Sequence, residues 1–313
     1  MEKRFDIIII GCGPAGMTAG IYAQRAGMKC VILEKMAVGG QVSLTPLVEN
    51  YPGYENIDGF ELSQKMFKQV ISLGIAVEFV NAEKIETSGK IKKVKAGDVT
   101  YTAPAIILSM GASPRQLGTS NDAKYNGKGV SYCAVCDGAF FKDKTVAVVG
   151  GGNTALQDID YLSLIAKKII HIHRRSEFRA DNVNVQNYEK LTNQKNSKIE
   201  SYFGYVIENL NGENKLESIE IKNIETGKKE ILNVEGLFVA IGRVPQTEIL
   251  EENIKIDEMG YIVTDEHMKT SIQGVFACGD ITHKFLRQIS TAVGDGAIAG
   301  TSASVYVKNI KRG

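Results

Sequence analysis

The stretch FDIIIIGCGPAGMTAGIYAQRAG, residues 5–27, decides the fold of this 313-residue chain. An apolar run is followed by Gly11, Gly13 and Gly16, then by small and apolar residues, and then by a second apolar run, CVILE, at 30–34. In such a strand–turn–helix–strand unit the first glycine makes the turn, the second admits a pyrophosphate, and the third lets the helix pack against the strand. The first amide groups of the helix then face the phosphates. The stretch therefore predicts a dinucleotide-binding unit on a parallel sheet.

The same pattern occurs a second time in the chain. Residues 144–166 read KTVAVVGGGNTALQDIDYLSLIA, and the apolar run IIHIH follows at 169–173. Gly150, Gly152 and Ala155 form the second turn, with alanine as the small third residue. Two copies predict an α/β fold with two Rossmann-like dinucleotide-binding domains.

The end of the second strand separates the two expected ligands. Glu34 stands there in the first copy, and a carboxylate suits a ribose 2′-hydroxyl, as in FAD. In the second copy the strand ends in HRRSEFRA (173–180), which places Arg174, Arg175 and Arg179 where the acid would be. Guanidinium groups suit a 2′-phosphate, although a solvated basic face is the alternative interpretation. We therefore expect FAD at the first turn and NADPH at the second.

Glycine- and proline-containing stretches mark the domain boundaries. SMGASPRQLG (109–118) and AIGRVPQT (240–247) each follow an apolar run and flank the second copy. We expect an FAD-binding domain made of residues 1–114 and 245–313, interrupted by an NADPH-binding domain at 115–244. The tail at 287–309, rich in small residues, is expected to be a helix packed closely against a neighbour.

The segment GVSYCAVCDGAF (129–140) contains the only cysteine pair close in sequence, Cys133 and Cys136. A structural zinc would need four cysteine or histidine ligands, and the chain has no second Cys-x-x-Cys. A static disulfide would be unusual in the cytosol, and a redox dithiol needs a thiolate, a proton donor and an electron source. Asp137 follows Cys136 directly and can exchange the proton. We expect a redox pair and no bound metal.

Composition excludes several classes of protein. The formal net charge is +1, which gives no field that would attract nucleic acid, and the apolar run near the start is broken well before the length of a membrane span. Five cysteines with one close pair fit a cytoplasmic enzyme better than a secreted domain stapled by disulfides.

Along essentially its whole length the chain resembles the low-molecular-weight thioredoxin reductases of bacteria. The likeness rests on GCGPAGMTAGIYA, GGQV (39–42), VENYPG (48–53), CAVCDG (133–138), GGGNTA (150–155), HRRSEFRA, FVAIGRVPQT, GVFACGD (274–280) and RQ (287–288), all in the family's order. It implies a homodimer in which electrons pass from NADPH to FAD, then to the cysteine pair and to thioredoxin. It further implies that Cys136 faces the flavin, that Cys133 attacks the thioredoxin disulfide, and that Asp137 protonates the leaving thiolate.

Together, the glycine patterns and the resemblance give the candidate cofactor residues. Those for FAD are Gly11, Gly13, Pro14, Ala15, Gly16, Glu34, Lys35, Gly40, Gln41, Asn50, Gly111, Gly279, Asp280, Arg287 and Gln288. Those for NADPH are Gly150, Gly152, Asn153, Thr154, Ala155, His173, Arg174, Arg175, Arg179 and Gly242. SMGA at 109–112 departs mildly from the family's usual Ala-Thr-Gly-Ala, and Cys12, Cys30 and Cys278 are expected to pack.

Other flavoproteins are alternatives. The electron-transfer subunit of a peroxidase system would carry a thioredoxin-like domain before the first glycine turn, and only ten residues precede Gly11. A reductase fed by reduced ferredoxin would not need the second turn and its arginines. A non-catalytic flavoprotein sensor would not need both a nicotinamide site and a cysteine pair, and high-molecular-weight thioredoxin reductases place their thiols after the first glycine turn.

The predicted insertion also suggests a domain motion. The flavin must meet both the nicotinamide and the cysteine pair, and both of these belong to the inserted domain. The connections near 112–117 and 242–247 contain glycine and proline, so they can act as hinges. We expect two orientations of the inserted domain, one for each electron transfer.

Overall fold

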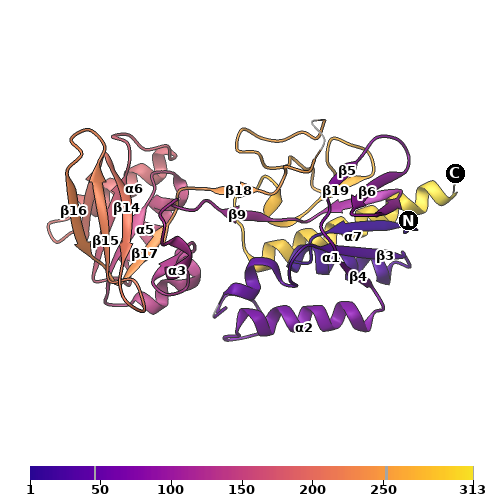
Figure 1. Cartoon of the computed structure of the whole chain (residues 1–313), viewed down its shortest axis with the longest axis horizontal. Coiled ribbons are helices and arrows are strands. Elements are labelled where there is room, and N and C mark those ends of the chain that lie inside the picture. The colour runs from indigo at the N-terminus through magenta and orange to yellow at the C-terminus, as the bar shows by residue number, and fades with distance from the viewer. Residues whose placement is uncertain (46, 251–252, 313) are drawn as a thin grey trace. The chain divides into compact units, whose positions relative to one another are not determined.

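The computed structural model describes residues 1–45, 47–250 and 253–312. The chain divides into two compact units: unit 1 is Met1–Ser113 with Val244–Gly313, and unit 2 is Pro114–Arg243. These limits lie one residue from the boundaries expected from the sequence. Figure 1 shows the chain leaving unit 1, forming unit 2 and returning.

Unit 1 is built on a five-stranded parallel sheet in the order β19-β8-β2-β3-β4. Its strands are β2 (Ile7–Ile10), β3 (Cys30–Glu34), β4 (Ala76–Phe79), β8 (Ala105–Leu108) and β19 (Val275–Ala277). All four residues of β2 are buried, as expected for a strand covered on both faces. The sequence pattern therefore predicted this sheet correctly.

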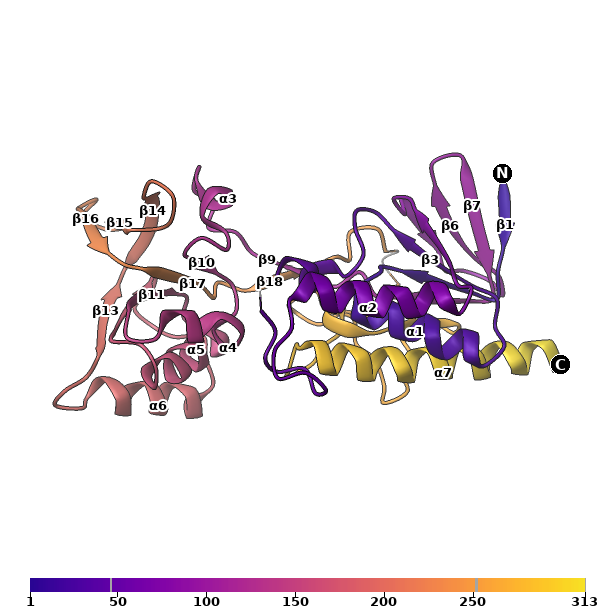
Figure 2. The same ribbon diagram turned by 90° about the horizontal axis from the view of Figure 1, so that it is seen from below.

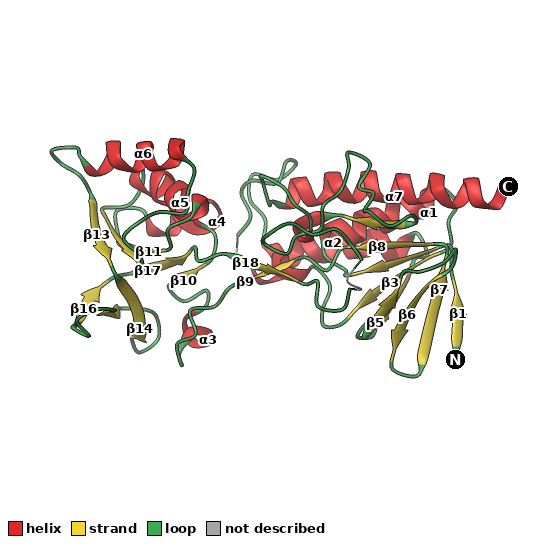
Figure 3. Cartoon of the chain, turned by 90° about the horizontal axis from the view of Figure 1, so that it is seen from above, coloured by secondary structure: helices red, strands yellow, loops and turns green. Residues whose placement is uncertain are grey.

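One face of this sheet is covered by helices (Figures 2 and 3). They are α1 (Pro14–Arg25), α2 (Gly59–Ser72) and the long α7 (Ile289–Arg312). Helix α7 lies close against α1, because a Cβ added at Gly300 would stand 2.4 Å from the Ala19 carbonyl oxygen. The small residues of the tail thus permit close helix packing, as expected.

A second sheet and short elements complete unit 1. The sheet has the order β1-β7-β6-β5, and its side chains Val94 and Tyr101 share a core with Ile8 and Ile10 of β2. Its strands are β1 (Glu2–Arg4), β5 (Lys84–Glu86), β6 (Lys92–Ala96) and β7 (Val99–Ala103), and the 3-10 helices are η1 (Gly40–Leu44) and η3 (Gly279–Ile281).

Unit 2 repeats the architecture on a smaller scale. Its parallel sheet has the order β10-β17-β11-β12-β13, made of Val130–Ser131, Gly236–Val239, Thr145–Val149, Lys168–His173 and Ile199–Phe203. An antiparallel sheet holds β14 (Tyr205–Asn211), β15 (Ser218–Asn223) and β16 (Lys229–Asn233). The helices are α3 (Asp122–Tyr125), α4 (Ala134–Asp137), η2 (Gly138–Phe141), α5 (Asn153–Ser163) and α6 (Asn182–Thr192).

The two connecting segments run beside each other. Strands β9 (Ala112–Pro114) and β18 (Arg243–Pro245) pair into a two-stranded sheet. Within unit 2 the Arg115 amide donates to the Gly242 carbonyl at 3.0 Å, and within unit 1 the Gln246 amide donates to the Gly111 carbonyl at 3.1 Å. The connections expected to act as hinges are thus paired strands. Gly111 (φ +72°) and Gly242 (φ +105°) stand beside them in backbone conformations that favour glycine.

Across the described residues, no helix combines the length and the apolar character needed to cross a membrane.

Candidate functional site

The first glycine turn leaves no room for side chains at two of its three glycines. Gly11 has φ +104°, and a Cβ there would stand 2.4 Å from the Ser109 carbonyl oxygen. A Cβ at Gly16 would stand 2.0 Å from the Gly11 carbonyl oxygen. Gly13, the N-cap of α1, has nothing within 4 Å of its added Cβ. Space therefore remains in front of the helix start, where Pro14, Ala15 and the following amides lie.

Glu34 ends β3 as a buried carboxylate with a fixed orientation. Its Oε2 accepts from the Cys12 amide at 2.8 Å, and its Oε1 accepts from the Met36 amide at 2.9 Å. Each carboxylate oxygen has a second lone pair, so both can also accept from ligand hydroxyls. The side chain of the neighbouring Lys35 is exposed. Glu34 thus has the chemistry that the ribose of FAD requires.

Several other residues expected at the flavin come together within unit 1. Asn50 Nδ2 donates to Gln288 Oε1 at 3.2 Å, which joins segments far apart in sequence. Gln41 Nε2 donates to the Ala112 carbonyl. Gly40 has φ +55°, and the nearest atom to a Cβ added there is the Gly13 Cα at 3.7 Å. Gly40 therefore lies beside the first glycine turn, as a shared role in binding FAD would require.

The turn that carries Asp280 is held by α7. Gly279 has φ +78°, and its amide donates to Asp295 Oδ2 at 3.0 Å. The same carboxylate pairs with Lys284, and both side chains are nearly buried. The Asp295 carboxylate thus fixes the backbone of η3 directly before Asp280.

Arg287 has a buried polar atom that suits a ligand in unit 1. Its guanidinium stacks over the Tyr261 ring at 4.0 Å from the centroid, and its Nη2 donates to the Thr282 carbonyl at 3.4 Å. Its buried Nε has no hydrogen-bond partner among the described residues. A buried N–H of this kind calls for an acceptor, and the phosphate and ring oxygens of FAD are acceptors. The residues of unit 1 therefore fit FAD.

The second glycine turn has the same backbone outline. Gly150 has φ +148°, and a Cβ there would stand 2.3 Å from the Ala240 carbonyl oxygen. Gly152 caps α5 with only one atom, at 3.9 Å, near its added Cβ. Asn153 holds the segment before α6, because its Nδ2 donates to Asp181 Oδ2 at 2.8 Å and its Oδ1 accepts from the Asp181 amide at 2.7 Å. Thr154 is exposed on the first turn of α5.

Strand register places His173, not an arginine, at the position of Glu34. Ile10 pairs with Leu33 before Glu34, and Val149 pairs with Ile172 before His173. The sequence-based placement of the arginines at the end of the strand was therefore wrong by one residue. The imidazole of His173 lies against Gly151. A Cβ added at Gly151 would stand 2.1 Å from a ring atom, so only glycine leaves room for the imidazole.

The arginines follow His173 on a loop bonded to the glycine turn. The Nε2 of His173 donates to the Glu177 carbonyl at 2.9 Å, and the Arg179 amide donates to the Gly151 carbonyl at 2.7 Å. The positive charges of Arg179 and then Arg174 lower the pKa of Arg175. Within the described residues none of the three arginines forms a salt bridge. Three cations that form no salt bridge with a carboxylate of the described residues fit the 2′-phosphate of NADPH.

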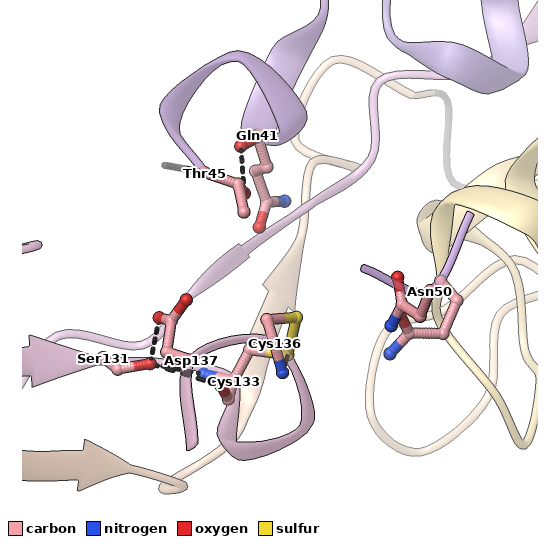
Figure 4. The surroundings of a disulfide bond; sticks show 8 residues. Gln41, Thr45, Asn50, Ser131, Cys133, Cys136 and Asp137 are labelled. Carbon is pink, nitrogen blue, oxygen red and sulfur yellow. Dashed lines mark hydrogen bonds between the residues drawn. A yellow bond between two sulfur atoms is a disulfide. The ribbon is translucent and has the colours of Figure 1, made fainter. Parts of the chain in front are cut away.

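Cys133 and Cys136 form a disulfide at the start of α4 (Figure 4). Cys133 is the N-cap of this helix, and its sulfur accepts from the Cys136 amide at 3.2 Å. Ser131 Oγ accepts from the Cys133 amide at 3.1 Å and donates to Asp137 Oδ2 at 2.6 Å. Ser131 therefore links the disulfide to the carboxyl group.

Asp137 is set up to hold a proton. Burial raises the pKa of its carboxyl group, and the Ser131 hydrogen bond opposes the shift. Its Oδ1 is buried and has no hydrogen-bond partner among the described residues. Because a buried oxygen without a donor favours the neutral acid, Oδ1 is the atom at which a proton would reside.

Three further cysteines lie outside the redox pair. Cys12, Cys30 and Cys278 are free and buried, and burial raises the pKa of Cys12 and Cys30 to about 12, so these thiols stay protonated. The described residues contain no cluster of three or more His, Cys, Asp or Glu side chains suited to a metal.

Sequence reasoning missed Ser131, Tyr261, Asp295 and Lys284. Ser131 had a usable signal, since it lies two residues before Cys133 in the same short segment. Asp295 is a lone acid in a helix of small residues, but its target at Gly279 is set by tertiary packing. Tyr261 had no local signal at all.

Comparison with known proteins gives a consistent result. A family model described as pyridine nucleotide-disulphide oxidoreductase matches residues 5–296. The thioredoxin reductase of Listeria innocua is 41% identical over 313 residues, covering 99% of this chain and 96% of the relative. The chain belongs to the thioredoxin reductase family. The family resemblance inferred from sequence motifs is thereby confirmed, as are the two-domain α/β fold and the cofactors FAD and NADPH.

Solved structures of the family give the same picture. The crystal structure of thioredoxin reductase from Streptococcus pyogenes has a TM-score of 0.88 at 40% identity, covering 98% of this chain and 99% of that one. A ferredoxin-flavin thioredoxin reductase from Clostridium acetobutylicum has a TM-score of 0.54 at 28% identity, covering 100% of both chains. The family thus includes a member named for a different electron donor.

Proposed function

We propose that the chain is an NADPH-dependent thioredoxin-disulfide reductase whose redox centre is Cys133–Cys136. The observation that carries the proposal is this disulfide bonded through Ser131 to a buried carboxyl group, in a chain with two dinucleotide turns. Membership of the thioredoxin reductase family supports it. Thioredoxin or a thioredoxin-like protein is the proposed partner.

The cofactor roles are assigned by unit. In unit 1 the glycine turn, Glu34 and Arg287 would hold FAD, together with the other residues expected from the sequence. In unit 2 the second turn would hold the pyrophosphate of NADPH, and Arg174, Arg175 and Arg179 would hold its 2′-phosphate. When bound, FAD accepts two electrons from a nicotinamide and passes them to a disulfide.

The protein's own groups then carry out thiol–disulfide exchange. Reduction of the pair adds two electrons and two protons and breaks the Cys133–Cys136 bond. The Cys136 amide already donates to the sulfur of Cys133, so this bond would stabilise a thiolate there. The Cys133 thiolate attacks one sulfur of the partner's disulfide, and the partner's other sulfur leaves and takes a proton.

The second half of the exchange restores the pair. Cys136 loses its proton and attacks the Cys133 sulfur, so the Cys133–Cys136 bond forms again and the partner leaves as a dithiol. Asp137 Oδ1 supplies a proton to the partner's first leaving thiolate and takes up the proton that Cys136 loses. The partner's second leaving thiolate takes up from solvent the equivalent of the proton that Cys133 released. Ser131 keeps the carboxyl group oriented by its bond to Oδ2. Two electrons and two protons are transferred to the partner in each cycle.

We also propose that the enzyme is a cytoplasmic homodimer. The dimer rests on the resemblance to low-molecular-weight thioredoxin reductases. The location rests on cysteine use, because one vicinal pair beside three buried free thiols fits a reducing compartment. Light scattering on the FAD-loaded protein should give the mass of two chains, and the mass of one chain would contradict the proposed dimer.

The test of function uses the purified FAD-loaded chain. NADPH should be oxidised rapidly only when an oxidised thioredoxin is present, and thioredoxin thiols should appear. Reduced ferredoxin offered in place of NADPH should support little turnover. A protein that reduces thioredoxin with ferredoxin but not with NADPH would be a ferredoxin-dependent enzyme and would contradict the proposal.

A further inference from the structure

A buried histidine distinguishes the second glycine turn from the first. His171 lies in β12, has no exposed surface and pairs with Val148. The same position in unit 1 is Ile32, which pairs with Ile9. An imidazole is costly to bury, so it needs hydrogen-bond partners that an isoleucine does not. Burial lowers the pKa of His171 to about 4, so the ring is neutral near neutral pH.

His171 belongs to a hydrogen-bond chain that can run in only one direction. Its Nε2 lies 2.8 Å from the Gly150 carbonyl oxygen, which can only accept, so Nε2 carries the proton. Its Nδ1 must then accept from the Tyr188 hydroxyl at 2.7 Å. The Tyr188 oxygen in turn accepts from Ser201 Oγ at 2.5 Å. Tyr188 therefore fixes the tautomer that donates to Gly150.

The carbonyl that His171 binds is that of the first motif glycine, and its unit 1 counterpart has a different partner. The Gly11 carbonyl lies 3.1 Å from Ser109 Oγ, whose hydroxyl is shared with the Ile10 carbonyl at 2.7 Å, and Ser109 directly follows β8. In unit 1 the strand order is β8-β2-β3, and in unit 2 it is β17-β11-β12. The first-glycine carbonyl is thus bonded from one flanking strand in unit 1 and from the opposite flanking strand in unit 2.

The third residue of each turn differs as well. In unit 1 the Gly11 carbonyl oxygen stands 2.0 Å from the place of a Gly16 Cβ, so only glycine is possible. In unit 2 the corresponding residue is Ala155, whose Cβ is accommodated. The Gly150 carbonyl is directed to His171 Nε2.

Carbonyl direction also sets the direction of the next amide. The C=O and N–H of a trans peptide point opposite ways, so fixing the Gly150 carbonyl fixes the Gly151 N–H. In unit 1 the equivalent amide, Cys12, is already bonded to Glu34 at 2.8 Å. For the Gly151 amide the described residues provide no acceptor. Among the described residues, the second turn thus leaves without a partner an amide that the first turn bonds internally.

We propose that His171, oriented by Tyr188, is a positioning residue for NADPH: it holds the 150–151 peptide so that the second turn accepts the pyrophosphate of the nicotinamide nucleotide. The inference rests on the proposed assignment of NADPH to unit 2. It adds a specific reason why the two turns are not interchangeable.

The test measures the Kd of NADP⁺ by titration of the oxidised, FAD-loaded protein. His171→Ile installs the residue of unit 1 and removes the donor, and it should raise the Kd about three- to tenfold, as for one lost hydrogen bond. His171→Gln keeps a donor near the position of Nε2 and should recover most of the affinity. The kcat with thioredoxin at saturating NADPH should change less than the KM for NADPH.

Two further variants keep the test decisive. Tyr188→Phe leaves the ring packing in place but frees the tautomer, so it should raise the Kd about two- to threefold even if His171→Ile does not fold. Ser109→Ala is the matched control in unit 1, and it should weaken FAD binding while leaving the NADP⁺ Kd within twofold.

The outcomes separate the inference from the proposed function. If the unaltered protein does not bind NADP⁺, the assignment of unit 2 is wrong and the inference falls with it. If the unaltered protein binds NADP⁺ but neither His171→Ile nor Tyr188→Phe changes the Kd by more than twofold, the inference alone is wrong. Equal weakening by His171→Gln and His171→Ile would show that packing, and not the donated hydrogen bond, matters.

Discussion

The two glycine turns share a backbone outline but differ in side chains that lie against it, Glu34 in unit 1 and His171 and His173 in unit 2. Gly11 and Gly150 sit equally close to the carbonyl oxygens of Ser109 and Ala240, at 2.4 and 2.3 Å from an added Cβ. Yet the strand after the helix ends in Glu34 in one unit and in His173, followed by arginines, in the other. We therefore expect the motif to fix the place of a pyrophosphate and the residues at the end of the neighbouring strand to select the nucleotide.

The largest predicted effect concerns what only unit 2 contains, the cysteine pair. Cys133→Ser and Cys136→Ser should each reduce thioredoxin reduction to background, because exchange needs both sulfurs. FAD content and bleaching of the flavin by NADPH should persist in both variants. Thioredoxin-reductase activity in either variant would remove the pair from the mechanism.

The next effect concerns nucleotide choice in unit 2. Each charge-assisted hydrogen bond to the 2′-phosphate contributes roughly 1.5–3 kcal/mol, so two contacts favour NADPH over NADH by about two to four decades in kcat/KM. Replacing Arg174 and Arg175 with glutamine should remove most of that preference and barely change the kinetics with NADH. Equal use of the two nucleotides by the unaltered protein would contradict this reading of the loop.

Exchanging the third turn residues should give unequal results. Gly16→Ala pushes a methyl group to 2.0 Å from the Gly11 carbonyl oxygen, so it should cost about 2–3 kcal/mol in the free energy of unfolding and lower the FAD content. Ala155→Gly should cost only about 1 kcal/mol, the difference in helix propensity. Urea unfolding and flavin absorbance measure both, and equal losses would mean that the two turns have the same geometry.

The smallest effect is the pH dependence of stability from His171. Its folded pKa, about 4, lies below the ordinary value of 6.5, so acid protonates the unfolded chain first. This contribution to stability is present above pH 6.5 and decreases as the pH falls toward 4. Between pH 6.5 and 5.5, protonation of this histidine in the unfolded chain should lower the free energy of unfolding by about 1 kcal/mol. Urea unfolding of His171→Gln should lack this part of the slope, and an unchanged slope would contradict a buried neutral ring.

The sequence predicted what depends on local backbone constraints. Gly11 and Gly150 need positive φ and close approach, so the glycine spacing located both turns. The apolar runs located the strands beside them, and the glycine- and proline-containing stretches located the insertion. The resemblance added residues such as Asn50 and Gln288, which the fold joins across 238 positions. Their contacts with cofactors and the rotation of unit 2 stay predictions.

What the sequence could not supply depends on register and packing. The strand pairing places His173, one residue before Arg174, at the position where an arginine was expected. The end of a strand is set by its pairing with neighbouring strands and not by composition. The bonds from Gly279 to Asp295 and from His171 to Gly150 join residues with no shared motif. Such partners become visible only when the strands and helices are in place.

The most direct test of the central claim, that two specialised turns feed one cysteine pair, is an anaerobic electron count. FAD-loaded protein is mixed with a limiting amount of NADPH and an excess of oxidised thioredoxin, and thioredoxin thiols are measured. The account predicts two thiols per NADPH consumed, and a much slower reaction when NADH replaces NADPH. NADPH consumption without thioredoxin thiols, or equal rates with NADH, would contradict it.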